Sequence, residues 1–503
     1  MVQLTLRRTW TAAAKYAFAA CALCAMATPA SAAGDDEALI NYFSARLNGS
    51  EEAFSQNTPV EFSQIEAQQQ AVWQAWAKAN EAFDEERLIP LDELSLKKHS
   101  SWTLPAKLEY NAVMNYYYGK KGARPEAGYP LFLYLHGSGD KNNEWANGIK
   151  FGNSFEDGPS VYFIPQIPNT GDYYRWWQKG KQWAWEKLLR QLYLTGDIDP
   201  NRIYFFGISE GGYGSQRLAS YYGDYLAGAG PMAGGEPLKN APVENCRNLA
   251  FNFRTGADDT GFFRNQLTQA TKDAFEAAQK KYPDGFVHHI ELIPGKGHQI
   301  DYTKTTPWLA QYTRNPQPKH VIWENFEMDG IHRKGFANIC VEEDPRSEFD
   351  TYRITYFMDI EGNEITLASK KTVYNCTETE NGIDKFFKKF YYNLNKGKIR
   401  LYLSPKLVDF NQPVKITANG KVLFNGMLQP TVQDMANSLA TFYDPERIFP
   451  ASVLIDFASD GTGIAGVEMD EAKDGHYYDL AGKMTTQPQS GVYITSNGKK
   501  VMF

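Results

Sequence analysis

The chain has 503 residues, of which 43% are hydrophobic and 22% charged, so two or three globular domains are expected and a largely disordered chain is excluded. Its formal net charge of −7 argues against nucleic acid or an anionic membrane surface as a partner.

The first 32 residues have the pattern of an export signal peptide. Three cations (Arg7, Arg8 and Lys15) precede an apolar run over residues 16–26, and Ala30-Ser31-Ala32 has the small residues of a cleavage site. Cleavage before Ala33 removes those cations and takes the formal charge from −7 to −10. We therefore expect a secreted, cell-surface or periplasmic protein. The alternative is a membrane anchor, but the apolar run is too short to span a bilayer, and no later segment predicts a membrane span.

Residues 33–101 are expected to form an N-terminal helical segment. Their apolar residues recur three and four positions apart, as on one face of a helix. They are Ile65, Val72, Trp73, Trp76 and Phe83.

Residues 102–315 predict an α/β domain with a mostly parallel, doubly wound sheet. Strand-like alternation runs from residue 102 to 118, and apolar runs typical of strands buried on both faces follow. The later strands are expected at 131–135, 161–164, 202–206, 249–253 and 286–293, with helices at 181–194 and 265–281.

Residues 316–458 predict a β-rich accessory domain. Apolar and polar residues alternate at 351–357 and 414–418, and Asn419-Gly420 is a strong hairpin signal before the next apolar run. Residues 459–503 are expected to be a linker and a tail with short strands.

Three cysteines remain after the signal peptide, so at most one internal disulfide can form. Cys340 and Cys376 are the expected pair, because both flank strand-like segments of one region, and Cys246 is left over.

Residues 207–211 form a G-x-S-x-G pentapeptide around Ser209. An apolar run over 203–206 precedes it and a helical pattern follows, which is the strand–turn–helix context of a nucleophile elbow. Glycines on both sides of the serine would let the helix approach the strand closely.

A serine nucleophile requires a base and an orienting acid, and in α/β-hydrolases the chain order is Ser, Asp or Glu, then His. The strand at 249–253 is followed by Asp258 and Asp259, of which Asp259 is preferred, although either could cap the next helix. The strand at 286–293 is followed by a glycine-rich turn and His298, the expected base. The other histidines downstream are expected to be structural: His288, His289, His320 and His332.

The oxyanion of an acyl-transfer intermediate needs fixed N–H donors. One is expected from the amide of Glu210, directly after the nucleophile. The second is expected from the loop at 136–140, at the Ser138 amide.

The motifs HGSGD, GISEGG, GADDTGFFRN and GKGH resemble those of the α/β-hydrolase superfamily, over about residues 105–315. They look most like its secreted esterases, which include feruloyl and acetyl carbohydrate esterases and polyhydroxyalkanoate depolymerases. The resemblance implies serine esterase chemistry without a cofactor or a metal, with Ser209 as nucleophile, Asp259 as acid and His298 as base.

An aromatic-rich loop at 165–177 follows the second strand of the α/β domain and is expected to overhang the site. Trp176 and Trp177 could bind a sugar ring or an aromatic acyl group, or could simply pack the loop down. Trp145 is a weaker candidate of the same kind.

The tail, with its YDLAGK, GVYI and NGKK segments, is similar to C-terminal sorting modules of exported Bacteroidetes proteins. A short terminal hairpin packed on the β-rich domain is the alternative.

The leading hypothesis is an exported serine esterase that acts on feruloyl or acetyl substituents of polysaccharides. A prolyl-oligopeptidase-type peptidase is the alternative enzyme, although such enzymes normally carry a β-propeller before the hydrolase domain. A non-catalytic glycan-binding protein on a hydrolase scaffold is the alternative from another class, and the complete Ser-Asp-His set argues against it.

Overall fold

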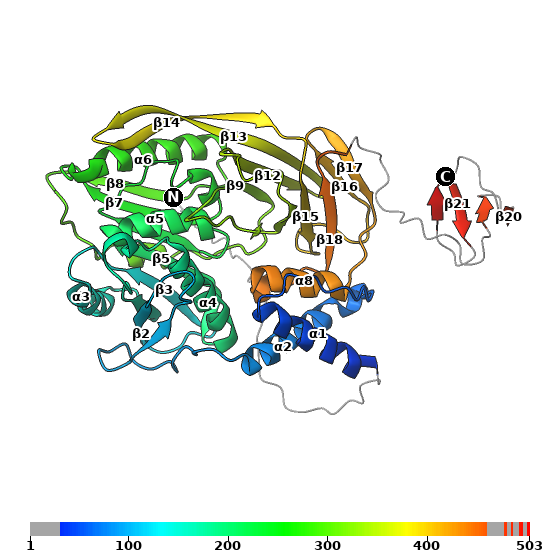
Figure 1. Cartoon of the computed structure of the whole chain (residues 1–503), viewed down its shortest axis with the longest axis horizontal. Coiled ribbons are helices and arrows are strands. Elements are labelled where there is room, and N and C mark those ends of the chain that lie inside the picture. The colour runs from blue at the N-terminus through cyan, green and yellow to red at the C-terminus, as the bar shows by residue number, and fades with distance from the viewer. Residues whose placement is uncertain (1–30, 460–476, 480–483, 486–491, 496–499, 503) are drawn as a thin grey trace, which may run out of the picture.

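The structure, a computed structural model, describes residues 31–459, 477–479, 484–485, 492–495 and 500–502. A helix-covered sheet lies beside a β-rich part and three helices (Figure 1). The predicted signal peptide falls almost wholly on residues 1–30, which are outside the described residues.

The first part is built on an eight-stranded sheet with the order β1-β2-β4-β3-β5-β6-β7-β8. β2 pairs antiparallel with β1 and β4, and all pairs from β4 to β8 are parallel. The strands are β1 His99–Thr103, β2 Val113–Lys121, β3 Tyr129–Leu135, β4 Ser160–Pro165, β5 Ile198–Ile208, β6 Gly228–Met232, β7 Ala250–Gly256 and β8 His288–Ile293.

Helices cover both faces of this sheet, because its strands are apolar on both sides. On one face Leu133 and Phe205 share a core with α4, α5 and α6, and on the other Phe132 and Phe206 share a core with α3 and α7. The helices are α3 Lys141–Ser154, α4 Lys179–Thr195, α5 Glu210–Tyr222, α6 Arg264–Lys281 and α7 Thr305–Leu309. This is the α/β-hydrolase fold, and the predicted fold class is confirmed.

The start of this sheet differs from the prediction. The alternation over 102–118 is not one strand but two antiparallel strands, β1 and β2. Pro105 interrupts the alternation, and the Leu104 amide donates to the Ala112 carbonyl at 2.9 Å, which closes the connection between the strands.

The second part consists of two sheets with the orders β10-β11-β15-β18 and β17-β16-β13-β12-β9, the latter extended by β14 beside β13. A β-rich region here was predicted, and the helix α8 Val432–Phe442 within it was not. The strands are β9 His320–Asn325, β10 Gly335–Phe336, β11 Ile339–Glu343, β12 Arg353–Glu361, β13 Glu364–Glu380, β14 Ile383–Asn393, β15 Lys398–Leu403, β16 Val414–Ala418, β17 Lys421–Gly426 and β18 Ala451–Asp456.

The N-terminal helices α1 Ser31–Leu47 and α2 Ile65–Ala82 belong to the core of this second part. Phe43 and Trp76 share one apolar core with Leu439 of α8 and with strands of both sheets. The connection between α1 and α2 also bonds to this part, since the Val60 amide donates to the Pro430 carbonyl at 2.8 Å.

The expected disulfide between Cys340 and Cys376 is wrong. Cys340 is buried in β11 and Cys376 is exposed in β13, so the two lie in different sheets, and Cys246, Cys340 and Cys376 are all free thiols.

The described parts of the tail form a four-stranded sheet of β19 Tyr477–Asp479, β20 Met484–Thr485, β21 Val492–Thr495 and β22 Lys500–Met502. None of the helices in the described part of the chain has the length and apolar character that a membrane crossing needs.

Candidate active site

Ser209 stands on a strained turn between β5 and α5. Its φ of 57° and ψ of −113° lie outside the regions that a side-chain-bearing residue prefers, and its amide donates to the Met232 carbonyl at 2.9 Å. A Cβ on Gly211 would come within 1.9 Å of the Leu135 carbonyl oxygen, so only glycine permits α5 to start this close to β3. The local sequence therefore forms the predicted strand–turn–helix elbow.

His298 and Asp259 meet Ser209 at the carboxyl ends of the parallel strands. The Nε2 atom of His298 lies 3.0 Å from Ser209 Oγ, and its Nδ1 atom lies 2.8 Å from Asp259 Oδ2. Asp259 is 3% exposed, whereas the His298 side chain is 42% exposed, so the pair opens to solvent on the histidine side. Because Nδ1 faces the carboxylate, it carries the proton, which leaves Nε2 free to accept the serine hydroxyl proton.

Of the two candidate acids, only Asp259 contacts His298. Asp258 is exposed, and its amide donates to the Lys296 carbonyl at 2.9 Å. Asp258 therefore joins the acid-bearing loop to the histidine-bearing loop through its backbone.

Arg264 is a second partner of the acid, and its role was not predicted. Its Nε atom donates to the same Oδ2 atom of Asp259 at 2.9 Å, and its Nη1 lies 3.4 Å from the hydroxyl of Tyr213. The guanidinium is 9% exposed. A buried carboxylate needs such compensation, so Arg264 stabilises the charge of Asp259 and fixes its orientation.

The predicted oxyanion donors lie at the two loops next to Ser209. A Cβ at Gly137 would lie 3.5 Å from the Ser209 Cβ, which puts the 136–140 loop against the serine. Within the described chain, neither the Ser138 amide nor the Glu210 amide donates to a protein acceptor. Glu210 is the first residue of α5, where an amide has no partner within the helix.

Hydrogen bonds with Glu144, Tyr174 and Ile167 hold the 136–140 loop in place. Glu144 Oε2 accepts from the Gly137 amide at 3.2 Å, and the Tyr174 hydroxyl donates to the Gly137 carbonyl at 2.8 Å. His136 is fully buried, and its Nε2 accepts from the Ile167 amide at 3.1 Å. Burial lowers the pKa of His136 to about 4, so it is a neutral structural residue.

The side chain of Glu210 is an unusual neighbour for a nucleophile. It is 9% exposed; its Oε2 lies 3.5 Å from Arg175, and Oε1 has no partner in the described structure. Burial raises the pKa of this carboxyl from 4.5 to about 7. Glu210 was predicted as a backbone donor only.

The tryptophans expected to bind substrate are mostly packed. The expectation for Trp176 is wrong, because its ring is fully buried and its Nε1 donates to the His136 carbonyl at 3.0 Å. Trp177 is half-buried with the Arg217 guanidinium 3.9 Å from its ring centre. Trp145 stacks on Tyr117 at 4.1 Å.

Other aromatic side chains are exposed instead. Tyr173 is 45% exposed in the loop before α4, and Phe262 is 69% exposed three residues after Asp259. The Arg264 guanidinium that binds Asp259 lies 5.5 Å from the Phe262 ring centre. The motif GADDTGFFRN contains Phe262 and Arg264, but a Phe262-Phe263 pair is ordinarily buried, so the exposure of Phe262 was not predicted.

The remaining histidines do not join the triad. His320 pairs with Asp359 at 2.8 Å at the surface of the β-rich part, with no serine in hydrogen-bonding range of the pair among the described residues. The described chain holds no cluster of three or more metal-ligating side chains.

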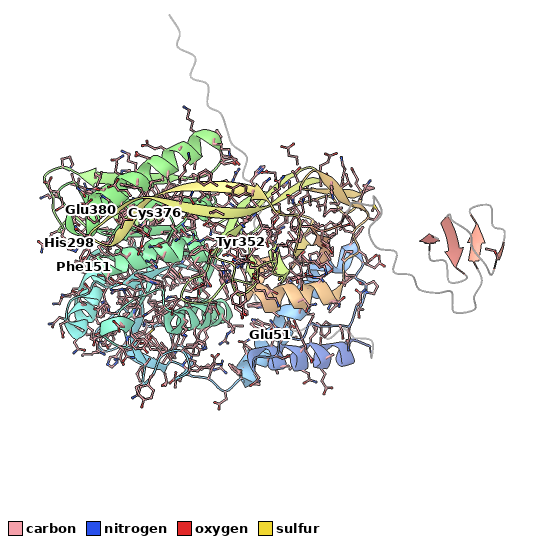
Figure 2. All side chains as sticks on the ribbon, turned by 45° about the horizontal axis from the view of Figure 1, so that its top comes forward. Glu51, Phe151, His298, Tyr352, Cys376 and Glu380 are labelled. Carbon is pink, nitrogen blue, oxygen red and sulfur yellow. The ribbon has the colours of Figure 1, made fainter. Side chains whose placement is uncertain are left out.

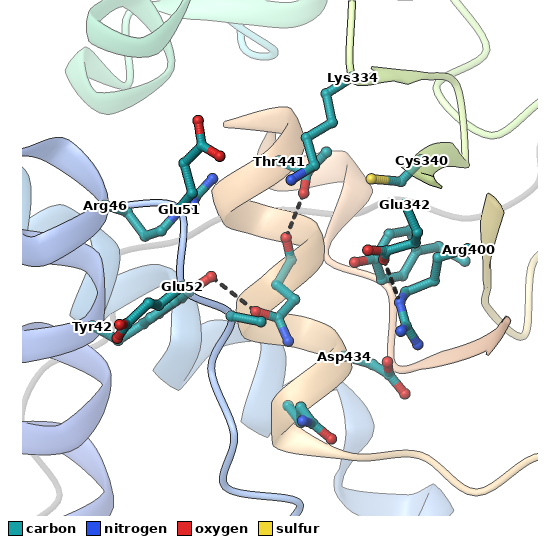
Figure 3. A pocket seen from close by; sticks show the side chains of 14 residues that line it. Tyr42, Arg46, Glu51, Glu52, Lys334, Cys340, Glu342, Arg400, Asp434 and Thr441 are labelled. Carbon is teal, nitrogen blue, oxygen red and sulfur yellow. Dashed lines mark hydrogen bonds and ion pairs between the residues drawn. The ribbon is translucent and has the colours of Figure 1, made fainter. Parts of the chain in front are cut away.

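A separate pocket of about 200 Å³ lies between α1, α8 and the β-rich sheets (Figure 3). Charged side chains line it, and one pair of them, Arg400 and Glu342, lies 2.7 Å apart. None of the triad residues lines this pocket.

No protein-family model and no curated protein matches the sequence. Among solved structures, the chain is similar to a thermostable esterase (20% identity, 44% of this chain, 64% of that chain, TM-score 0.33). It is also similar to a ferulic acid esterase from the anaerobic fungus Anaeromyces mucronatus (14%, 42% and 87%, TM-score 0.31) and to the BES protein from Bacillus cereus (14%, 45% and 99%, TM-score 0.33).

The chain thus spans less than two thirds of the thermostable esterase that it matches. With all three TM-scores below 0.5, the fold assignment depends on the strand order and the elbow described above.

Proposed function

We propose that this chain is a serine hydrolase that cleaves carboxylic esters through an acyl-enzyme. The observation that carries the proposal is the relay of contacts from Ser209 Oγ to His298 Nε2 at 3.0 Å and from His298 Nδ1 to Asp259 Oδ2 at 2.8 Å. A serine hydroxyl becomes a nucleophile only when a base of this kind takes its proton.

In the first half of the reaction, Ser209 Oγ bonds to the ester carbonyl carbon while its proton passes to His298 Nε2. The carbonyl electron pair moves onto oxygen, where the amides of Ser138 and Glu210 would stabilise it. The tetrahedral intermediate then expels the alcohol, which takes the proton from Nε2.

In the second half, water loses a proton to His298 Nε2 and attacks the acyl carbon. The second tetrahedral intermediate then releases the carboxylic acid, and Ser209 Oγ takes back the proton from Nε2. Asp259 orients the imidazole and balances its positive charge in both halves, and Arg264 keeps Asp259 in place.

We further propose that the enzyme is exported and acts on feruloyl or acetyl esters of polysaccharides. The basic-apolar-small pattern of residues 1–32 supports export. The esterase-like motifs and the exposed ring of Phe262, which lies 5.5 Å from the Arg264 guanidinium that binds Asp259, support a substrate with a flat ring. In this proposal residues 102–315 are the catalytic domain, 33–101 and 316–458 flank it, and 459–503 form a sorting-like tail.

A substrate panel tests this proposal. It contains p-nitrophenyl acetate, methyl ferulate, acetylated and feruloylated oligosaccharides, and proline-containing peptides. We expect ester turnover, and a loss of about 10³-fold or more in kcat/KM for Ser209→Ala and His298→Ala. Turnover of peptides alone would overturn the ester assignment.

His320→Ala is the matched control, because it removes a surface histidine that also pairs with an aspartate but lies away from the serine. It should keep the wild-type kcat/KM. Ester turnover that survives in Ser209→Ala would contradict the mechanism.

A further inference from the structure

A long hairpin of the β-rich part reaches the loops and α6 of the hydrolase part. β13 pairs with β12 only as far as Thr372, and beyond that point β14 continues beside β13 to the Asn381-Gly382 turn. We call residues 373–390 the arm. A two-stranded hairpin alone is only marginally stable in water, so the arm depends on what it packs against.

The arm packs against the hydrolase part along its length. Alternate residues of β14 face that part: Lys389 lies 2.8 Å from Glu244, and the ring of Phe387 lies 5.4 Å from the Lys239 ammonium. Figure 1 shows the arm running over α6, and in Figure 2 Glu380, at the end of the arm, lies on the same side of the molecule as His298.

Lys385 makes the last of these contacts, at the tip. It is 2% exposed, and its Nζ lies 2.5 Å from both Glu378 and Glu380 of the arm itself. The same ammonium donates to Gln266 Oε1 of α6 at 3.1 Å and lies 4.5 Å from the centre of the Phe263 ring. The contacts of Lys385 with Gln266 and Phe263 therefore join the tip of the arm to the start of α6.

Lys385 contacts the end of the loop that carries Asp259. Phe262 and Phe263 follow one another with φ of 51° and 59°, in the left-handed region that non-glycine residues rarely adopt, and Arg264 comes next. Arg264 binds Asp259 Oδ2. Two successive strained residues persist only when the surroundings hold them, and Lys385 is one such contact from the β-rich region.

We propose that Lys385 is a positioning residue of the active site: through Phe263 and Gln266 it holds the 258–264 loop in the conformation that sets Asp259 against His298. The β-rich part thereby supports the active site through this loop. This inference builds on the proposed function.

The test compares Lys385→Ala with Lys385→Arg and with Lys388→Ala. Lys388 is an exposed lysine of the same strand whose Nζ lies 5.3 Å from the Phe390 ring of the arm, so it is the matched control. The readouts are kcat and KM for p-nitrophenyl acetate, the rate at which a fluorophosphonate labels Ser209, and Tm.

We expect Lys385→Ala to lower kcat and the labelling rate by about 10- to 100-fold with little change in KM, because a small displacement of the acid weakens the base without removing a substrate contact. Lys385→Arg should recover most of the rate, since a guanidinium can also lie on the Phe263 ring. Lys388→Ala should behave as wild type. A wild-type labelling rate in Lys385→Ala would overturn the proposal, as would a change confined to KM.

If Lys385→Ala does not fold, Gln266→Leu removes the acceptor from the hydrolase side and leaves the arm intact. It should slow labelling in the same direction, and a wild-type rate there would overturn the proposal.

If the wild-type protein neither hydrolyses an ester nor reacts with the fluorophosphonate, the proposed function is wrong. Positioning is then still tested by proton NMR of the Nδ1–H between His298 and Asp259. That resonance should broaden or move in Lys385→Ala but not in Lys388→Ala, and its persistence unchanged in Lys385→Ala would count against the inference.

Discussion

At the residue scale, Glu210 shows how a side chain beside a nucleophile can carry a charge that depends on pH. Its carboxyl is buried, faces Arg175 at 3.5 Å with one oxygen, and leaves the other without a partner among the described residues. Burial disfavours the ionised form, which raises the pKa to about 7. At pH 5 the Glu210 carboxyl is therefore mostly protonated in the folded protein and mostly ionised in the unfolded chain.

This difference makes stability depend on pH. A carboxyl whose pKa rises on folding stabilises the fold at pH values below its unfolded pKa, and this contribution is lost as pH rises through about 7. Between pH 5 and 8 the group should remove up to about 3 kcal/mol from the free energy of unfolding. Gln at this position does not titrate, so the Tm of Glu210→Gln relative to wild type should rise from pH 5 to pH 8.

Thermal unfolding of both proteins at the two pH values checks this expectation. Glu276→Gln, at an exposed position of α6, is the control and should keep the same small Tm difference at both. A Tm difference for Glu210→Gln that does not change with pH would contradict the burial argument.

The residues of the triad could be predicted because each follows a strand of the same sheet, and parallel strands end at one edge. Arg264 could not, because its approach to Asp259 depends on the left-handed backbone of Phe262 and Phe263, which no local pattern indicates. Trp176 and Trp177 are adjacent in sequence, and only the folded loop shows that the first ring is buried and the second half-buried.

At the scale of elements, the elbow depends on a close approach of α5 to β3. A Cβ on Gly211 would meet the Leu135 carbonyl oxygen at 1.9 Å, and backbone cannot move aside as a side chain can. We expect Gly211→Ala to destabilise the fold by about 3 kcal/mol or more, at the upper end of overpacking effects.

Gly297 is the matched comparison, because a Cβ there has open space although it lies beside His298. Gly297→Ala should change the free energy of unfolding by no more than about 0.5 kcal/mol. The Tm values of the two variants check both statements, and equal Tm values would contradict the close-approach argument.

Most strands of the hydrolase sheet could be predicted from apolar runs, but β6 was missed. Its sequence, Gly-Ala-Gly-Pro-Met, has few of the β-branched and aromatic residues that mark a strand. The structure explains these small residues: a Cβ on Gly230 would lie 2.5 Å from a Thr305 methyl group and 3.0 Å from Leu309, where α7 packs on the sheet. The small residues of β6 are required by its packing against α7, so strand propensity alone could not predict this strand.

At the scale of the whole molecule, a buried cluster of charges joins the two parts. Arg447, next to α8, lies 2.6 Å from Asp224 at the end of α5 and 2.8 Å from Asp444. Arg333 also pairs with Asp224, and Arg314 pairs with Asp444 at 2.8 Å. Each carboxylate is shared between two guanidinium groups, so the loss of one cation leaves a buried charge undercompensated.

We expect Arg447→Leu to destabilise the protein by about 3–5 kcal/mol, since its partners Asp224 and Asp444 stay buried. This corresponds to a fall in Tm of about 5–10 °C. Arg400→Leu is the control, because its pair with Glu342 is about one third exposed on both sides and contributes about 1 kcal/mol or less. Calorimetry of the two variants decides, and a Tm for Arg447→Leu no lower than that for Arg400→Leu would contradict the expectation.

The packing between segments far apart in the sequence was the least predictable feature of the structure. Periodicity indicated that residues 33–101 contain helices, but not that α1 and α2 complete the core of strands more than 200 residues later. Such a partnership depends on shape and on burial at distant positions, which a single sequence does not display.

The partnership of the first helices with the β-rich sheets has a consequence for the order in which the molecule can form. α1 and α2 precede the strands of the β-rich sheets in the chain, yet the apolar core that Phe43 and Trp76 share with those sheets includes residues of β18 and is complete only once β18 exists. At ordinary synthesis rates that interval is roughly 20 to 80 s, during which two amphipathic helices stay uncovered while the intervening hydrolase sheet can already assemble. During this interval α1 and α2 are therefore exposed to misassociation, and a chaperone that shields residues 39–79 would protect newly made chains.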